Sequence, residues 1–220
     1  MVAANSGFQN DPNYQTTEQT AVQLGAFALG DPGDSEVMTT LPPGTYSVAI
    51  APNAADADDG VALLEVYDAD AVGGGSMIAN LSTRGQVGAN AGSLSAGFVV
   101  SGTAPKNVLV RGIGPDLAQF GVTNPAGAVD INVYDANGNL IATNSGFQND
   151  PNAGAIEQLW STVGAFAIGD PGNSELLLNL APGNYTVEVV PTNADAPDGV
   201  GMLEVYDADA AVPAPLANTN

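Results

Sequence analysis

The stretch Leu64-Glu65-Val66-Tyr67-Asp68-Ala69-Asp70 returns unchanged at residues 203–209. Its alternating apolar side chains, followed by acidic turn residues, predict a β-strand that buries one face. The two copies end a longer duplication, in which residues 5–70 and 144–209 align at a constant offset of 139 and 40 of the 66 aligned positions are identical. A repeat of this kind predicts a chain built from structural modules.

A weaker repeat lies between the two copies. The motif Val-Tyr-Asp-Ala occurs at residues 66–69, 133–136 and 205–208, at steps of 67 and 72 residues. We therefore predict three related modules of about 70 residues each, in the order A, B and A′. Residues 1–72 form half-module A, residues 76–209 form one complete β-sandwich from B and A′, and residues 210–220 form a proline-rich tail.

Strand signals dominate the chain. Residues 46–50 and 185–190 are β-rich runs that follow Pro-Gly turns, and Asn137-Gly138 between two apolar runs predicts a β-hairpin. Helix is expected only at residues 115–120 and 155–163. Further strands are expected at 61–67, 97–100, 108–111, 129–134, 166–168, 176–180 and 200–206. Short strands separated by glycine and proline predict an all-β fold, an antiparallel β-sandwich of immunoglobulin-like or jelly-roll-like type.

The composition excludes several kinds of function. The chain holds 24 acidic residues against three basic ones, Arg84, Lys106 and Arg111, for a net charge of −21. Nucleic acid is disfavoured as a partner because phosphate binding needs clustered cations. The absence of Cys and His removes disulfides, thiol nucleophiles and the commonest zinc ligands. The sequence has no apolar run long enough to insert into a membrane, and we expect a secreted protein whose export signal lies outside this sequence.

Calcium is the sharpest ligand candidate, because clustered Asp oxygens suit a hard cation. The candidate ligands fall in three kinds of loop: Asp56, Asp58 and Asp59; Asp195 and Asp198; and the strand ends Asp68, Asp70, Asp207 and Asp209. None of them follows the spacing of a calcium-binding helix–loop–helix site, and Pro197 replaces Asp58 in the second copy. The alternative is that these side chains are solvated turn carboxylates that cap strand ends.

The segment Gly-Phe-Gln-Asn-Asp-Pro-Asn is identical at residues 7–13 and 146–152. One interpretation is structural: Asp11 and Asp150 form side-chain turns before proline, while Phe8 and Phe147 enter the core. The other is a ligand-binding loop.

Four phrases carry a resemblance to a known family. They lie at residues 80–85, 111–122 (RGIGPDLAQFGV), 164–166 and 203–207, and they resemble a β-rich tandem repeat of large secreted proteins of environmental bacteria. The resemblance covers nearly the whole chain. It implies an extracellular module, and it brings no enzymatic activity, catalytic residue or required cofactor.

The odd number of modules suggests a function. If one A-type and one B-type module close a sandwich, half-module A is left open. We expect a non-enzymatic structural protein that assembles with itself, head to tail, into a fibre or surface layer, with each open half completed by a neighbouring subunit. Leu216, Ala217 and Asn218 repeat the pattern of residues 78–80 and are the candidate donor strand. The alternative is an adhesive module, calcium- or carbohydrate-binding, of a larger surface protein.

Overall fold

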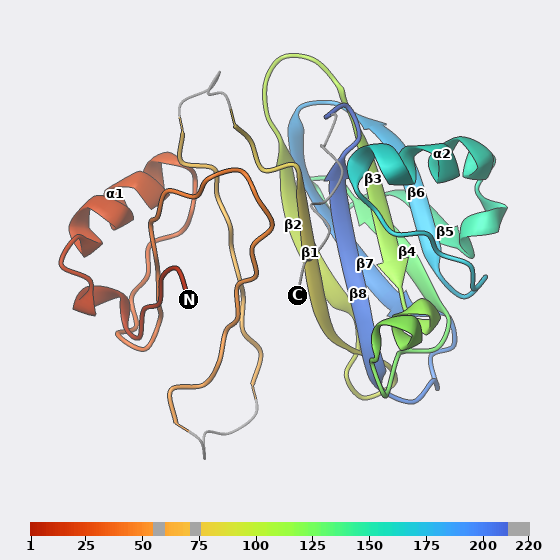
Figure 1. The fold of residues 1–220 in the computed structure, drawn as a ribbon, viewed down its shortest axis with the longest axis horizontal. Coiled ribbons are helices and arrows are strands. Elements are labelled where there is room, and N and C mark those ends of the chain that lie inside the picture. The colour runs from red at the N-terminus through yellow and green to blue at the C-terminus, as the bar shows by residue number, and fades with distance from the viewer. Residues whose placement is uncertain (55–59, 71–75, 211–220) are drawn as a thin grey trace. The chain divides into compact units, whose positions relative to one another are not determined.

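The computed structural model describes residues 1–54, 60–70 and 76–210 (Figure 1). The chain divides by its internal contacts into two units, Met1–Ile78 and Ala79–Asn220. Every β-strand in the described ranges belongs to the second unit. No helix in the described ranges is long and apolar enough to cross a bilayer.

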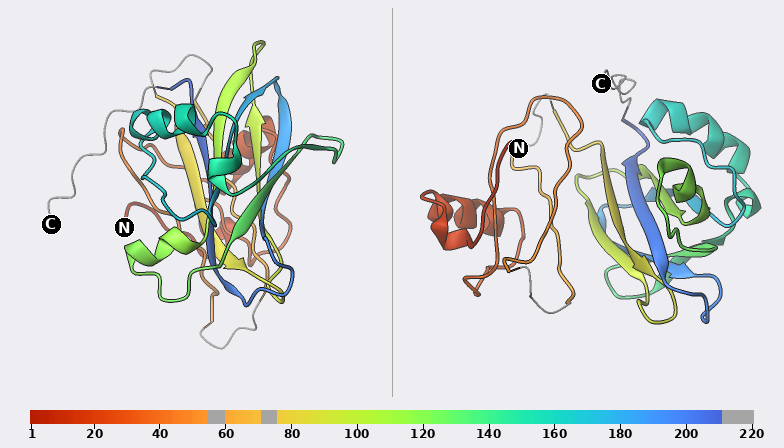
Figure 2. Two further views of the ribbon diagram at one scale, coloured as in Figure 1. Left: turned by 90° about the vertical axis from the view of Figure 1, so that its right-hand side faces the viewer. Right: turned by 60° about the horizontal axis from the view of Figure 1, so that its bottom comes forward.

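The second unit is a β-sandwich of two four-stranded antiparallel sheets, which confirms the prediction of an antiparallel β-sandwich (Figures 1 and 2). The first sheet has the order β1 (Asn80–Val87), β8 (Gly199–Asp207), β3 (Lys106–Ile113) and β6 (Ser174–Leu180). The second sheet has the order β2 (Leu94–Val100), β7 (Gly183–Pro191), β4 (Val129–Tyr134) and β5 (Leu140–Ser145).

The two halves of the sandwich interleave. Each ladder joins one of the strands β1–β4 to one of the strands β5–β8. Strand β3 lies between β8 and β6, and β4 lies between β7 and β5. We call residues 76–139 the B half and residues 140–209 the A′ half. Neither half has a ladder of its own within the described residues, so each supplies the neighbours that the other needs.

The core fills the space between the sheets. Val110 and Leu203 from the first sheet and Ile131 and Val187 from the second are at most 1% exposed. Gly112 allows the sheets to approach, since a Cβ atom there would lie 3.0 Å from Ile131 Cγ1. At about 25 cal/mol per Å² of buried apolar surface, this core is the main source of stability.

Short helices cover the outer face of the first sheet. They are η2 (Pro115–Phe120), η3 (Phe147–Asn149) and α2 (Ala153–Val163). Ile156 of α2 packs on Leu109 and Tyr206, side chains of β3 and β8 that point away from the inter-sheet core. The helix predicted at 115–120 has these bounds, and the one predicted at 155–163 begins two residues earlier.

Two local predictions have opposite outcomes. The hairpin between β4 and β5 is confirmed: its turn has Gly138 at φ 78°, where glycine avoids a Cβ clash, and Asp135 accepts hydrogen bonds from Asn137 and Asn139. The strand predicted at residues 166–168 is wrong, since this segment is irregular. Its Ile168 is buried against Ile113 and Met202, so the segment covers the outer face of the sheet and joins no ladder.

The first unit contains η1 (Phe8–Asn10) and α1 (Tyr14–Gln23). The strands predicted at residues 46–50 and 61–67 are not formed, because no described residue of this unit lies in a ladder. The physical reason is the interleaved topology: the corresponding strands β7 and β8 pair with strands of the B half, and residues 1–70 contain no B-type segment.

Candidate functional site

Residues 1–70, which we call the A half, correspond to residues 140–209 at the offset of 139. Their apolar side chains are exposed where those of the A′ half are buried. Val48 is 63% exposed while its counterpart Val187 is fully buried, and Leu64 is 45% exposed while Leu203 is 1% exposed. The same holds for Val37, Leu41, Ile50 and Tyr67 against Leu176, Leu180, Val189 and Tyr206. The A half therefore presents an uncovered core face.

The local framework of the A half is nevertheless formed. The Phe8 amide donates to the Asp34 carbonyl at 2.7 Å, as Phe147 does to Asn173 at 2.8 Å in the A′ half. The Tyr46 hydroxyl donates to the Pro42 carbonyl at 2.7 Å, as in the other copy. Among the described residues, 36–54 and 60–70 form no hydrogen bonds between main-chain groups. The half thus has its turns and helix but lacks sheet partners.

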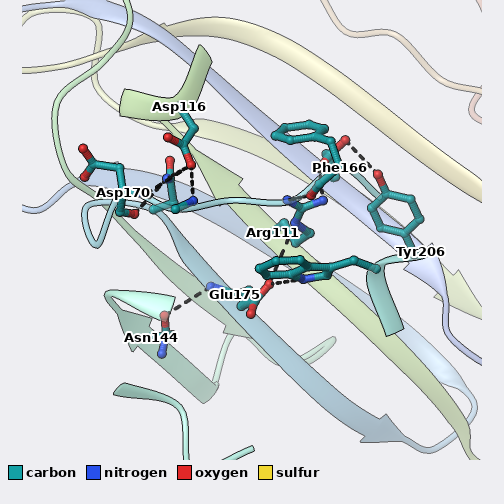
Figure 3. A network of polar contacts seen from close by, with 11 residues as sticks. Arg111, Asp116, Asn144, Phe166, Asp170, Glu175 and Tyr206 are labelled. Atoms are coloured by element: carbon teal, nitrogen blue, oxygen red, sulfur yellow. Dashed lines mark hydrogen bonds and ion pairs between the residues drawn. The ribbon is translucent and has the colours of Figure 1, made fainter. Parts of the chain in front are cut away.

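A buried polar cluster joins the two halves of the closed sandwich (Figure 3). Arg111 of β3 lies in register between Glu175 of β6 and Glu204 of β8, and its side chain is fully buried. Its Nη1 atom is 3.2 Å from Glu204 Oε2, its Nε atom is 3.9 Å from Glu175 Oε2, and its Nη2 atom donates to the Phe166 carbonyl at 2.6 Å. Trp160 and Phe166 present their rings to the guanidinium.

The cluster holds two carboxylates against one cation. Burial raises the pKa of Glu175, and the net result is a pKa of about 7. The hydrogen bond from Trp160 Nε1 and the charge of Arg111 lower this pKa, but by less than burial raises it. Burial also raises the pKa of Glu204, which accepts a hydrogen bond from the Tyr206 hydroxyl at 2.9 Å. A protonated Glu175 leaves Arg111 and Glu204 as a neutral pair, which is the state that a desolvated site favours.

The A half carries the acidic part of this cluster without the arginine. Glu36 and Glu65 correspond to Glu175 and Glu204, and the Tyr67 hydroxyl donates to Glu65 at 3.2 Å. Glu36 Oε1 is buried without a hydrogen-bond partner, and burial, with the charges of Glu18 and Asp11, raises the pKa of Glu36. The A half therefore carries both carboxylates of the closed cluster at the same places in its sequence, without the arginine.

A second contact distinguishes the two copies. Asn173 is fully buried, accepts a hydrogen bond from the Gly114 amide at 3.0 Å and donates to Asp116 Oδ2 at 2.9 Å (Figure 3). Its counterpart in the A half is Asp34. A carboxylate at this position can accept the hydrogen bond from a main-chain amide, but its negative charge repels Asp116. The B half of this chain is therefore a better partner for the A′ half than for the A half.

The sequence reasoning missed this cluster. One sequence feature could have indicated it. Glu36 and Glu65 interrupt apolar strand patterns, and glutamate occurs at the same places in the second copy, in a chain with only three cationic residues. A charged residue kept inside an otherwise buried strand suggests a buried partner.

The described calcium candidates near β3 have protein partners. Asp207 forms an ion pair with Lys106 at 2.6 Å. Asp209 accepts hydrogen bonds from the main-chain and side-chain nitrogens of Asn107, which lower the pKa of Asp209. These contacts are those of strand-end caps.

The other candidates lie in separate turns. Asp198 accepts from the amides of Asn90 and Ala91, which lower its pKa, and Asp68 accepts from the amide of Asp70. The Asp195 amide donates to Asn193. In the described ranges, no three acidic residues are grouped so that they could hold a metal ion. Asp56, Asp58 and Asp59 lie outside the described residues, as do Leu216, Ala217 and Asn218.

The repeated segment at residues 7–13 and 146–152 follows the structural interpretation. Phe8 and Phe147 are 3% and 2% exposed. Asp11 and Asp150 each accept a hydrogen bond from the amide two residues later, at 2.7 Å in both copies. The segment is a turn that anchors a phenylalanine in each copy.

A shallow groove of about 460 Å³ lies over the second sheet. Tyr134 of β4 and Thr186 and Glu188 of β7 line it, together with Asp135 of the hairpin turn. The Tyr134 ring beside carboxylate and hydroxyl groups is a combination that can contact a sugar.

Comparisons with known proteins assign no family. No family model and no curated protein matches the chain. Among solved structures, the pre-peptidase C-terminal domain of a collagenase from Bacillus anthracis matches with a TM-score of 0.35 and 16% identity, over 58% of this chain and 89% of that chain. PliG of Aeromonas hydrophila, a periplasmic inhibitor of g-type lysozyme, matches with a TM-score of 0.32 and 13% identity, over 58% of this chain and 85% of its own. Similarity at this level carries no functional assignment.

Proposed function

We propose that this chain is a non-enzymatic structural protein of the extracellular space, a subunit of a fibre or surface layer in which open β-halves are completed by neighbouring segments. The observation that carries the proposal is the A half, whose turns and helix are formed but whose core face and strand edges are uncovered. Exposed edges of this kind provide directional main-chain hydrogen bonds and an apolar contact. A contact between two different surfaces does not close on itself and therefore propagates.

The tail supplies a candidate head-to-tail contact. Residues 216–218 repeat the pattern of residues 78–80, and β1 begins at Asn80 and pairs with β8. In the register of β1 and β8, a donated tail would therefore lie along residues 65–67 of the next subunit. Deletion of residues 211–220 is expected to abolish assembly while the sandwich stays folded.

Negative-stain electron microscopy of the purified chain tests the proposal. We expect uniform filaments, shortened or absent in the deletion variant. Filaments that disperse in chelator would assign a metal-binding role to the aspartate loops. Monodisperse particles with and without calcium would overturn the polymer proposal.

The groove at Tyr134 supports a second candidate, a carbohydrate-binding adhesive module. This function predicts a monomer whose melting temperature rises with a bound glycan. Substitution of Tyr134 by alanine should abolish that rise, whereas substitution of Tyr46, which lies outside the groove, should not. A glycan array without a single reproducible signal would remove this candidate.

A further inference from the structure

We infer that the A half is an acceptor for one kind of partner, a four-stranded segment of the β1–β4 type that carries an arginine at the place of Arg111 and a non-acidic residue at the place of Asp116. This inference deepens the proposed function and rests on it, because it names what completes the open half.

The strand places that must be filled come from the topology. In the closed sandwich, β8 needs β1 and β3, β7 needs β2 and β4, and β6 needs β3. The A half contains the counterparts of β6, β7 and β8 at residues 35–41, 44–52 and 60–68. A single donated strand of the β1 type would cover only the outer edge of the β8 counterpart. It would leave the places of β2, β3 and β4 empty, so the partner is a whole B-type segment.

The chain's own B half does not supply this partner. It is already paired with A′ through six ladders. Residues 1–220 hold two A-type halves and one B half, so copies of these residues leave one A-type half per copy without a B-type partner, and a donated tail would cover only the edge of that half. A second copy could donate its B half only by releasing its own A′.

The arginine requirement comes from charge and register. Arg111 lies directly between Glu175 and Glu204 across two ladders, and the A half has Glu36 and Glu65 at those positions. Closure by a segment without this cation would bury two carboxylates unpaired, which is strongly unfavourable. In the register of the closed copy, Glu36 and Glu65 therefore select both the partner and its register.

The partner needs a non-acidic residue at the place of Asp116 because the A half has Asp34 opposite that place. The Asn173 side chain donates to Asp116 Oδ2, and aspartate at the corresponding position cannot donate. An asparagine at the place of Asp116 would instead donate to the Asp34 carboxylate. The A half thus discriminates against the B half of its own chain by like charge.

The test extends the full chain with a second copy of residues 76–139 placed directly before Met1. This junction reproduces the natural step from residue 139 to Leu140, because Met1 is the counterpart of Leu140. The added copy carries Asp116→Asn. Hydrogen exchange followed by mass spectrometry should show amides of residues 36–52 and 60–68 exchanging on the order of 100-fold more slowly than in the unextended chain.

Matched variants of the added copy distinguish the effect of its arginine from the effect of adding a segment of this length. Arg111→Gln there should remove most of the slowing, whereas Arg84→Gln, at an exposed position of β1, should leave it unchanged. Combining Arg111→Gln with Glu36→Gln and Glu65→Gln should restore slowing, because no unpaired charge is then buried. An added copy that retains Asp116 should protect the A half less than the Asn version.

Three outcomes would overturn the inference. Fast exchange of residues 36–52 in the extended chain, with the original sandwich still protected, would show that a B-type segment is not the partner. Equal protection with Arg111→Gln would remove the arginine requirement. Protection of residues 36–52 of the unextended chain at high concentration would make a second copy the partner. Filament formation is measured separately, by electron microscopy. If hydrogen exchange shows a protected A half but no filaments form, only the proposed function is rejected.

Discussion

At the scale of single residues, the excess of carboxylate in the Arg111 cluster has a consequence for stability. Glu175 has its pKa raised to about 7 by burial, against 4.5 for a free glutamate. Between these values the folded state holds a proton that the unfolded state has lost, so stability falls as pH rises. Glu204 contributes with the same sign, since its pKa is also raised.

We predict that the free energy of unfolding of the sandwich decreases between pH 5 and pH 8, by up to about 3 kcal/mol from Glu175. Glu175→Gln should flatten this dependence, because glutamine does not titrate. Urea unfolding followed by the fluorescence of Trp160, the single tryptophan, measures it. Glu188→Gln, on β7 of the second sheet and away from the Arg111 cluster, is the control and should keep the slope. A slope that survives Glu175→Gln would assign the pH dependence to other groups.

The Asn173–Asp116 contact gives a prediction at the same scale. Asn173→Asp should destabilise the sandwich by about 1–3 kcal/mol, because it replaces a buried donor by a like charge. The double variant with Asp116→Asn should recover most of the loss, since the direction of the hydrogen bond is then reversed. Urea unfolding of the wild type, both single variants and the double variant measures the coupling. Additive effects of the two substitutions would contradict the discrimination assigned to Asp34.

At the scale of elements, the duplication supplies matched experiments inside one chain. Leu203 of β8 is buried between the sheets, and its counterpart Leu64 is 45% exposed. We predict that Leu203→Ala costs about 2–5 kcal/mol of sandwich stability, whereas Leu64→Ala costs less than about 0.5 kcal/mol. Urea unfolding with Trp160 as the probe distinguishes them. Similar losses at the two positions would mean that the A half contributes to the same cooperative fold.

Elements with local signals were predictable from the sequence. The turn at Asn137-Gly138 and the glycine after α2 set the hairpin and the helix end, since both depend on nearby residues alone. Strand β1 was not predicted, because it is an edge strand whose side chains are mostly exposed and whose apolar pattern is weak. The segment 166–168 was misread because a short apolar run that covers a sheet looks like a strand within one.

The pairing of elements was less predictable than their existence. The repeat identified residues 5–70 and 144–209 as related segments, but ladder partners are set by contacts distant in sequence, such as Asn80 with Tyr206. The same limit hid the Arg111 cluster, whose three charged members come from β3, β6 and β8. Sequence patterns indicate which residues of one strand are buried, but they do not identify the residues opposite them in the neighbouring strand.

At the scale of the whole molecule, the two units should differ in cooperativity. Within the described ranges, only residues 79–207 form a closed core. We therefore predict one calorimetric transition of about 90 kcal/mol near 60 °C and not the roughly 150 kcal/mol of a fully folded chain of this length. Scanning calorimetry of the full chain measures it. The chain extended by a second B half is the control and should gain enthalpy. An enthalpy near the larger value in the unextended chain would show that the A half is already part of a cooperative fold.

The interleaving of the two halves also determines when the protein can fold during its synthesis. Because β2 pairs with β7 and β1 pairs with β8, the second sheet lacks a member until Pro191 has left the ribosome, and the first until the residues near Asp207 have left it. At roughly 5–20 residues per second, the B half waits on the order of ten seconds for its partner. A chain held unfolded for that time can be threaded through a narrow secretion pore. The same topology that completes the sandwich thus keeps the nascent chain competent for export.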